Sequence, residues 1–382
     1  MRISEVMSLI DEEKIKAIGR LHQIDKANTK ITGEFILKVF VHGALQGIPM
    51  SLRSIETLVK DNKDLASNLK SKDDHKKKVD HSSIAKRLSS ANIDFFKAIY
   101  EDISDKYHNK FEPKKDFHIF DSTILTISNK LLKNGLNLGG FANDSHIKMS
   151  VSLKNSIPSS IRFCTTQSES SENIALVKAI NEAKLKKQDI ILFDQGIQKA
   201  ETFASFDRQE KFFITRVTCN RKYKFLSLNE IKKYKDDNLT ILSDENVHLF
   251  NKNDQEIKHP VRLIQAHKSN GDKICFLTNI KDLSSHDIAS AYKHRWKIEV
   301  FFKFLKQHLQ FKTFISYDTN GMQVYLYCLL IASILFIMYK ILNKLSGYKI
   351  ALLKFKLDLN RSIIKDIVLF CGGDPNLVDQ KL

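Results

Sequence analysis

Cysteine, proline and glycine are all scarce in this 382-residue chain. The five cysteines are scattered and form no C-x-x-C pair, so the sequence indicates neither a disulfide framework nor a cysteine zinc site. Five prolines and 13 glycines leave little room for long disordered linkers. The N-terminus carries acidic residues early and lacks a clean apolar run, so we expect no signal peptide. These features predict a cytoplasmic protein in a reducing compartment.

Negative charge is also in short supply. The chain has 61 lysine and arginine residues against 44 aspartate and glutamate residues, which gives a formal net charge of +17. A hydrophobic content of 42% is ordinary for a globular protein, and the length allows two or three structural units. The positive charge favours a polyanionic partner, and nucleic acid is the commonest. An anionic membrane surface is the competing partner.

The first 110 residues predict a helical and basic region. Residues 31–45 have helical periodicity, and Ser51 is a candidate cap for a second helix. A third helix is expected from residue 83 onward, with Leu88 inside and Arg87 outside. The outward face of this helix suits phosphates and base edges. The region therefore fits either a helix-turn-helix DNA-binding unit or a plain helical bundle with a basic surface.

Two aspartates accompany predicted strands. Residues 116–125 are rich in aromatic and β-branched side chains, which is typical of a strand, and Asp121 lies in the middle. A carboxylate inside an apolar strand is costly unless it is paired or binds a metal. Residues 190–193 predict a buried central strand that Asp194 follows, at the strand end where sites assemble in open α/β sheets. The alternative for Asp194 is a helix N-cap or a turn residue.

The second half of the chain combines short strands with one long apolar segment. Polar turns separate predicted strands at residues 212–217, 239–242, 247–250, 261–266 and 274–277, which indicates a β-rich insertion. Residues 322–342 are strongly apolar and long enough to span a bilayer, with lysines near one end. A fully buried helix in a protein core has the same composition.

Residues 291–306 predict a helix, because they contain no glycine or proline and have apolar positions at helical spacing. One strip of this helix carries Tyr292, Arg295, Glu299, Lys303 and Lys306. A single carboxylate thus lies among cations. One interpretation is ordinary i,i+4 ion pairing of Glu299 with Arg295 and Lys303. The other is a catalytic carboxylate next to phosphate-binding cations.

Asp121, Asp194 and Glu299 come from three separate predicted elements. Three such carboxylates can hold two divalent metal ions about 3.5–4 Å apart, which activates an attacking oxygen in phosphodiester chemistry. Mg²⁺ prefers these oxygen ligands. The lysines and arginines of a basic protein hold the phosphates of its DNA substrate.

These residues resemble a known family. Tyr292, Arg295, Glu299 and Lys306 match the Y-x2-R-x3-E-x6-K signature of the insertion sequence 4 family of bacterial transposases, which belong to the DDE group. Phe120-Asp121-Ser122-Thr123 resembles the family's first-aspartate motif. Phe193-Asp194-Gln195-Gly196 resembles the second motif. The resemblance covers nearly the whole chain apart from about the last 35 residues.

The resemblance implies an α/β fold, with a ribonuclease-H-like catalytic core interrupted by a β-strand insertion and preceded by a helical N-terminal domain. The implied units are a DNA-binding domain at 1–110, the first part of the core at 111–204, the insertion at 205–280, the second part of the core at 281–345 and a helical tail at 346–382. In the family a hydrophobic helix follows the signature helix and packs in the core. Residues 322–342 are therefore expected in the core, without a membrane partner.

The resemblance also implies an activity. Asp121, Asp194 and Glu299 would bind two Mg²⁺ ions, which Mn²⁺ can replace. Contacts to phosphates near the cleaved end would come from Tyr292, Arg295 and Lys306. The implied reaction is cut-and-paste transposition, with cleavage at the element's inverted-repeat ends, a hairpin on the opposite strand and attack on target DNA. The implied partners are double-stranded DNA and a second copy of the chain, in a homodimer that synapses two ends.

The sequence departs from the family pattern at one position. The family commonly has Asp-Arg-Gly in the second motif, whereas Gln195 follows Asp194 in this chain. A neutral amide cannot replace a guanidinium on a phosphate, so the contact made by that arginine is not expected here. Metal binding by Asp194 is unaffected. The alternative to an active enzyme is a catalytically inactive, sequence-specific DNA-binding protein derived from a transposase.

Overall fold

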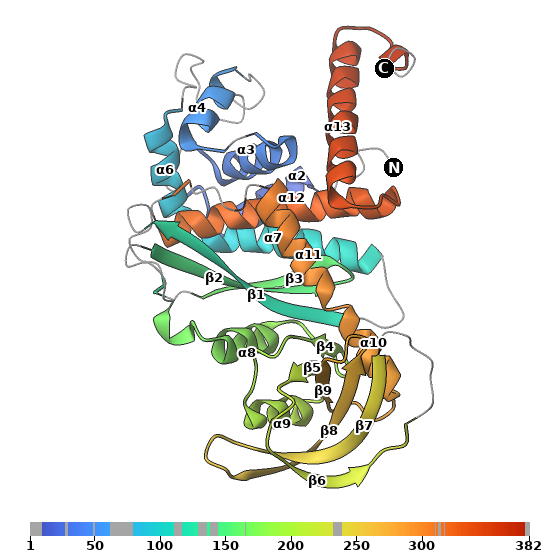
Figure 1. The fold of residues 1–382 in the computed structure, drawn as a ribbon. Helices are drawn as coiled ribbons and strands as arrows, with labels where there is room; N and C mark the ends of the chain where they lie inside the picture. Colours follow the sequence, from blue (N-terminus) through green and yellow to red (C-terminus); the bar gives the residue numbers. More distant parts are fainter. Residues whose placement is uncertain are drawn as a thin grey trace.

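One long sheet runs through the molecule, and helices cover both of its faces (Figure 1). The computed structural model describes residues 10–26, 30–48, 50–61, 79–110, 117–128, 136–137, 144–164, 166–231, 239–309, 311, 315–316 and 318–378. Within these residues the sheet has nine strands in the order β3-β2-β1-β4-β5-β9-β8-β7-β6.

The first five strands of this order form the core. They are β1 (Phe117–Ser128), β2 (Asp144–Lys154), β3 (Ile157–Cys164), β4 (Ile190–Leu192) and β5 (Phe212–Val217). β1, β2 and β3 pair antiparallel, whereas β4 runs parallel to β1 and β5 runs parallel to β4. The short β4 is fully buried, as expected for a parallel strand covered on both faces. The predicted α/β, ribonuclease-H-like fold is therefore confirmed.

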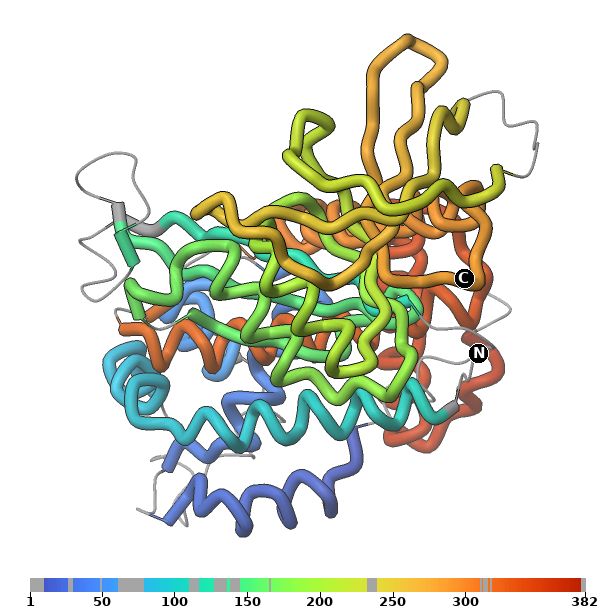
Figure 2. The backbone as a smooth tube through the Cα atoms, turned by 90° about the horizontal axis from the view of Figure 1, so that it is seen from below, coloured from blue at the N-terminus to red at the C-terminus, as the bar shows by residue number. Residues whose placement is uncertain are grey.

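Four further strands extend the same sheet beyond β5. They are β6 (Tyr223–Leu228), β7 (Leu239–Phe250), β8 (Glu256–Lys268) and β9 (Lys273–Thr278). β9 pairs antiparallel with β5, so the strand-rich insertion continues the core sheet. Figures 1 and 2 show these strands on the opposite side of the molecule from the N-terminal helices. The predicted unit boundaries within the chain stay a prediction.

β7 corrects one expectation from the sequence. Residues 239–242 and 247–250 were expected to form two strands, but a single strand passes through the polar residues between them. Asp244 in that stretch is fully buried and pairs with Arg262 of β8, with Nη2 and Oδ2 2.5 Å apart. Because this ion pair supplies a buried partner, the strand continues where its polarity suggested a turn.

The N-terminal helices pack around α12 (Thr319–Leu342). They are α2 (Glu12–Leu21), α3 (Gly33–Gln46), α4 (Leu52–Asp61), α6 (His81–Ser90) and α7 (Ile93–Lys110). Side chains of Asp11, Thr32 and Asp80 cap α2, α3 and α6 by accepting bonds from backbone N–H groups of the first turn. α3, α6 and α7 contact α12 directly. The bundle thus rests on one central helix.

Arg87 of α6 does not face outward as the sequence suggested. Its side chain is buried, and its guanidinium donates to the carbonyls of Ile31 at 2.9 Å and Ile24 at 2.7 Å. It also pairs with Asp25 at 2.8 Å. Burial is tolerated because these partners satisfy the guanidinium donors. Arg87 therefore holds α6 against the segment that precedes α3.

α12 accounts for the apolar segment near residue 330. Every residue from Gly321 to Tyr339 is buried, between the N-terminal helices and β3. Among the described residues it is the one helix long and apolar enough to cross a membrane, and 89% of its most apolar stretch lies inside the protein. Its composition is that of a core helix surrounded by protein.

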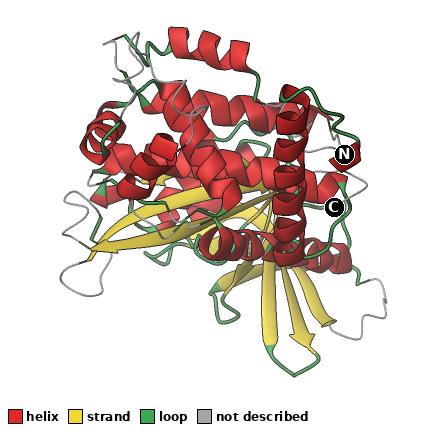
Figure 3. Cartoon of the chain, turned by 90° about the horizontal axis from the view of Figure 1, so that it is seen from above, coloured by secondary structure: helices red, strands yellow, loops and turns green. Residues whose placement is uncertain are grey.

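The remaining helices flank the sheet and the core (Figure 3). They are α8 (Glu172–Glu182), α9 (Ala200–Arg208), α10 (Ser285–Lys293), α11 (Trp296–His308) and α13 (Tyr348–Phe370), with a short 3-10 turn, η2 (Gln167–Glu169). α8 contributes Leu176 and Ile180 to the hydrophobic cluster on one side of the sheet. α11 and α12 belong to the larger cluster on the other side.

Candidate functional site

Asp121 and Asp194 lie at corresponding positions of two neighbouring strands. β1 and β4 are parallel, with Ile119 paired to Leu192, and each aspartate follows two residues later. Side chains two residues apart point to the same face of a sheet, so both carboxylates lie on the side of Ile119 and Leu192. This is the face that α11 covers, since α11 contacts β1. The pairing register therefore brings together two residues that are 73 positions apart.

The chain turns sharply after Asp194. Its Oδ1 accepts a 2.8 Å bond from the backbone N–H of Gly196, and its carbonyl accepts a 2.9 Å bond from the Thr215 hydroxyl. A Cβ on Gly196 would lie 2.4 Å from Cγ of Glu172, so a larger residue would displace that side chain. The glycine thus lets the turn approach α8 closely. Asp194 is a turn residue, as the alternative interpretation predicted. It also lies close to Asp121, and these two aspartates together with Glu299 are called the carboxylate group below.

Glu299 reaches the same region from the first turn of α11. Its Oε1 pairs with Nη2 of Arg295 at 2.5 Å, while its Oε2 is buried without a hydrogen-bond partner. The predicted i,i+4 ion pair with Arg295 therefore exists. Lys303 is exposed, and the ion pairs found within the described ranges include none between it and Glu299. The ion pair uses only Oε1, so it does not account for a second carboxylate oxygen that is buried without a partner.

The predicted signature helix is divided in two. α10 ends at Lys293 and α11 begins at Trp296, so Tyr292 and Arg295 precede the helix that carries Glu299. Backbone bonds from His294 to Ala291 and from Arg295 to Tyr292 span three residues, which tightens the chain at the junction. The junction sets the Arg295 guanidinium carbon 5.6 Å from the centre of the Tyr292 ring. Arg295 thus lies between Tyr292 and Glu299 and contacts both.

Lys306 lies two turns farther along α11 than Glu299, a distance of about 10 Å at 1.5 Å per residue. Its side chain is half-buried. Gln195, at the position where the family commonly has arginine, is exposed. A guanidinium does lie nearby, because Arg221 donates to the side chain and backbone of Gln198 at 3.1 and 2.8 Å.

The carboxylates share one electrostatic environment. Burial and the charge of Asp194 raise the pKa of Asp121 to about 7, and Glu172 adds to the increase. A bond from the backbone N–H of Ser122 and the charge of Arg295 act in the opposite direction. Keeping the ionised Asp121 close to Asp194 and Glu172 therefore lowers the stability of the folded protein.

Two residues of this group carried no signal in the sequence. Glu172 begins α8, and its Oε2 pairs with the buried Lys148 of β2 at 2.5 Å. Lys148 also donates to the carbonyl of Ser170 at 2.9 Å. Oε1 of Glu172 is buried without a hydrogen-bond partner. An acidic residue in the first turn of a helix is common, so only the packing of α8 against the sheet identifies Glu172 as a neighbour of Asp194.

The donor set fits a hard divalent cation. Asp121, Asp194 and Glu299 offer carboxylate oxygens, the ligands that Mg²⁺ prefers. A cation between the carboxylates would offset the repulsion that raises the pKa of Asp121 and would give the unpaired Oε2 of Glu299 a partner. In the present side-chain positions, the described residues do not gather three or more such ligands closely enough to hold a metal. A metal held by all three carboxylates would therefore require their side chains to move toward a common point.

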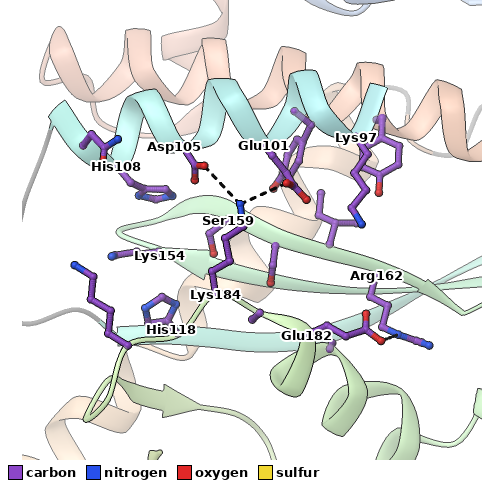
Figure 4. A pocket seen from close by; sticks show the side chains of 18 residues that line it. Lys97, Glu101, Asp105, His108, His118, Lys154, Ser159, Arg162, Glu182 and Lys184 are labelled. Carbon is purple, nitrogen blue, oxygen red and sulfur yellow. Dashed lines mark hydrogen bonds and ion pairs between the residues drawn. The ribbon is translucent and has the colours of Figure 1, made fainter. Parts of the chain in front are cut away.

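A separate pocket of about 400 Å³ lies between α7, β3 and the end of α8 (Figure 4). Side chains of both signs line it, and Lys184 pairs with Glu101 and Asp105. Asp121, Asp194 and Glu299 are not among its lining residues. The three carboxylates therefore lie outside this pocket.

The family profile described as "Transposase DDE domain" matches residues 112–335, more than half of the chain. This chain belongs to the DDE transposase family. The match includes Asp121, Asp194 and Glu299, and it confirms the family resemblance drawn from the sequence.

Three relatives carry transposase names. A Sinorhizobium fredii protein named as transposase y4zB is 29% identical over 164 residues, 43% of this chain and 45% of the relative. A Geobacillus stearothermophilus protein, named for insertion sequence element IS5377, is 27% identical over 157 residues, 41% of each chain. A Synechocystis protein, named for insertion sequence element IS4SA, is 24% identical over 263 residues, 66% of this chain and 70% of the relative. The matches thus span less than half the length of the first two relatives.

One solved structure is also similar. It is the piggyBac transposase synaptic complex with hairpin DNA, with a TM-score of 0.47 and 10% sequence identity. The alignment covers 88% of this transposase and 72% of that chain.

The raised pKa of Asp121 leads to a prediction for the protein in the absence of metal ions. Replacing Asp121 by asparagine is expected to raise its free energy of unfolding by about 2–4 kcal/mol at pH 8, because the variant no longer places a disfavoured charge beside Asp194. The folded-state pKa of about 7 exceeds the ordinary value of 3.8, so the wild type loses this stability as pH rises from about 4 to 7. Urea unfolding in EDTA across this range measures both effects. Equal pH profiles for the variant and the wild type would contradict the prediction.

Proposed function

We propose that this transposase performs cut-and-paste transposition, cleaving DNA at its element's inverted-repeat ends and joining the freed ends to target DNA. One observation carries the proposal. Asp121 and Asp194 on parallel strands are linked through Arg295 to Glu299, whose Oε2 is buried and unpaired. The net charge of +17 suits a DNA substrate, whose phosphates bind lysine and arginine.

In this proposal Asp121, Asp194 and Glu299 hold two Mg²⁺ ions, for which Mn²⁺ can substitute. Such ions, when bound, supply activation of an attacking oxygen and stabilisation of a leaving oxygen in phosphodiester cleavage and strand transfer. Regular elements of the core support the three carboxylates, since Asp121 belongs to β1, Asp194 follows β4 after one residue, and Glu299 belongs to α11, which packs on β1. Rigid support matters because small displacements of catalytic groups lower the rate strongly.

Tyr292, Arg295 and Lys306 are proposed to bind DNA phosphates near the cleaved bond. Arg295 presents a planar guanidinium that matches a phosphate by two parallel hydrogen bonds. Its Nε is buried without a partner, which leaves a donor available beside Glu299. In the protein without DNA, Glu299 holds the guanidinium at 2.5 Å and so keeps it at the site.

The proposed partners are double-stranded DNA, as element ends and as target, and a second copy of the chain. A homodimer would bring two ends together for coordinated joining. Residues 1–110 are proposed as the DNA-binding domain. The other units are proposed with the bounds predicted from the sequence. The proposal places the protein in the bacterial cytoplasm with its DNA.

The test uses purified protein and linear DNA that carries the inverted repeats flanking the reading frame. Cleavage at the repeat ends is expected with Mg²⁺ or Mn²⁺, and none is expected in EDTA. Specific binding without cleavage under every metal condition would favour a catalytically inactive DNA-binding protein instead.

Glu172 provides a further prediction. A Cβ on Gly196 would lie 2.4 Å from Cγ of Glu172 and 2.9 Å from Oδ1 of Asp194, so the two side chains are neighbours, and Oε1 of Glu172 is unpaired. Replacing Glu172 by glutamine is therefore expected to weaken binding of Mn²⁺ by about 10–100-fold. Isothermal titration with Mn²⁺ measures this affinity without DNA. The matched control is Glu182→Gln at the other end of α8, where the side chain is 61% exposed and pairs with Arg162. An unchanged affinity in Glu172→Gln would show that this carboxylate has no part in metal binding.

A further inference from the structure

The pocket between α7, β3 and the end of α8 is not used by the proposed reaction (Figure 4). Its volume of about 400 Å³ is typical of small-molecule sites and does not admit a DNA duplex. Most of its lining side chains are polar or charged. The cations among them are Lys97, Lys154, Arg162, Lys184 and Lys186, and they outnumber the carboxylates. The pocket therefore suits a small, charged ligand.

The carboxylates that line the pocket are already paired with cations. Glu101 and Asp105 of α7 lie 3.5 and 3.7 Å from Nζ of Lys184, which reaches across from the end of α8 (Figure 4). Glu182 pairs with Arg162 of β3 at 3.0 Å. A metal ion or another cation would have to displace a lysine or an arginine before it could bind here. The charge of the ligand is therefore expected to be negative.

Positive charge remains at both ends of the pocket. Lys97 of α7 lies at one end, and Lys154 and His118 lie at the other (Figure 4). Lys186 belongs to the His118 end, because its backbone N–H and the Nε2 of His118 both contact Oδ2 of Asp189, at 2.8 and 3.2 Å. Within the described ranges, neither Lys97 nor Lys186 has a carboxylate partner for its ammonium group. These two exposed ammonium groups are available to a ligand.

Tyr100 adds a hydrogen-bond donor without an acceptor. Its side chain lines the pocket and is 1% exposed, and its hydroxyl is buried without a hydrogen-bond partner. Burial, the neighbouring Tyr327 and the charge of Glu101 raise the pKa of Tyr100 well above its usual range, so the hydroxyl keeps its proton at neutral pH. A buried donor without an acceptor lowers the stability of the fold, and an acceptor on a bound ligand would recover that loss.

We propose that this pocket binds a small, soluble polyanion that carries phosphate groups. In the proposed complex, Lys97 and Lys186 bind anionic groups at the two ends, and the Tyr100 hydroxyl donates to an oxygen of the ligand. Lysine suits this role because its ammonium is a compact point charge that binds phosphate. A compound with two linked phosphoryl groups offers negative charge in both directions. The ligand would join α7 to the segment that leads from α8 to β4.

Isothermal titration of the full chain with inorganic pyrophosphate, in EDTA and about 150 mM salt, tests the proposal. EDTA removes the metal ions through which pyrophosphate could bind to the carboxylate group. Saturable binding of one pyrophosphate per chain is expected. Lys97→Gln and Lys186→Gln are each expected to weaken this binding by about 10-fold or more, because each removes a charge-assisted hydrogen bond.

The matched control is Lys187→Gln, which makes the same change of charge one position along the chain. Lys187 is 80% exposed, pairs with Glu210 and is not among the lining residues. Its replacement is expected to leave the affinity for pyrophosphate unchanged. An equal loss in Lys186→Gln and Lys187→Gln would overturn the proposal, since it would show a general attraction to surface charge. The absence of binding by the wild type would overturn it as well.

Tyr100→Phe tests the contribution of the buried hydroxyl. This variant is expected to weaken pyrophosphate binding by about 5-fold, the effect of one lost hydrogen bond. Its control is Tyr325→Phe, which removes another buried, unpaired hydroxyl that does not line the pocket and is expected to leave the affinity unchanged. Thermal unfolding without ligand checks that both variants are folded. Unchanged affinity in Tyr100→Phe would exclude the hydroxyl from the site.

Competition with DNA tests the source of the phosphate. Duplex DNA is expected to leave pyrophosphate bound, and Lys97→Gln is expected to keep wild-type DNA binding in gel shifts. Displacement of pyrophosphate by duplex DNA, with weaker DNA binding by Lys97→Gln, would assign these cations to a DNA-binding surface and overturn the small-ligand site. None of these measurements needs cleavage, so their outcome is independent of the proposed reaction.

Discussion

Replacing Asp194 by asparagine is expected to lower DNA cleavage by about 10³-fold or more while leaving DNA binding intact. Metal ions held by these carboxylates would contribute several kcal/mol to stabilising the transition state, and each 1.36 kcal/mol is a factor of ten in rate. Asp121→Asn and Glu299→Gln are expected to have the same effect, because three carboxylates that hold the same metal ions would act as a unit. The measurement is cleavage of end-containing DNA in Mg²⁺, alongside gel-shift binding in the same buffer.

The control for these variants is Glu210→Gln. Glu210 is an exposed carboxylate that pairs with Lys187 and lies away from the carboxylate group. It is expected to keep wild-type cleavage. Full cleavage by any one of the three carboxylate variants would contradict its assignment as a metal ligand. Loss of DNA binding together with cleavage would point to a folding defect, which thermal unfolding of the same samples detects.

Replacing Asp244 by alanine is expected to destabilise the protein by about 3–5 kcal/mol, the largest stability effect that we predict. Asp244 is fully buried and is the carboxylate that neutralises Arg262, at 2.5 and 3.2 Å. Removing it leaves a buried guanidinium without a counter-charge. Arg262 also donates to the carbonyls of Ile280 and Leu283 at 2.7 and 2.8 Å, just before α10. The pair thus ties β7 and β8 to the segment that leads to Tyr292.

Urea unfolding measures this effect. The matched control is Glu182→Ala, which removes a carboxylate from the largely exposed end of an ion pair and is expected to cost less than about 1 kcal/mol. The double variant Asp244→Leu, Arg262→Met is expected to recover most of the lost stability, because apolar residues of similar size often replace a buried ion pair without loss. A change below 1 kcal/mol in Asp244→Ala would show that the guanidinium finds another partner.

Patterns confined to one element were predictable from the sequence. The apolar face of α11, with Ile298, Phe301 and Leu305, is buried as its spacing indicated. The expected cap at Ser51 is also confirmed, since its hydroxyl accepts a 3.0 Å bond from the backbone N–H of Ser54 in the first turn of α4. Such patterns are local, because the period of a helix or strand fixes which side chains share a face.

Relations between elements were less predictable. The break between α10 and α11 falls inside a stretch with uniform helical periodicity, because backbone bonds over three residues tighten it without glycine or proline. Arg87 looked like an outward cation, yet it is buried because three acceptors from distant segments converge on it. β7 runs through polar residues because Arg262 of another strand neutralises Asp244.

The sequence by itself determined the family and the three candidate carboxylates, since motif spacing is a property of the chain. The composition near residue 330 fitted both a membrane span and a core helix, and the burial of α12 decided between them. Only the tertiary structure decided that Glu172 lies beside Asp194 and pairs with Lys148, that Asp121 has a raised pKa, and that several apolar side chains of α13 are exposed. Proximity, burial and exposure depend on how separate elements pack. The spacing of residues along the chain does not reveal which distant elements will be in contact.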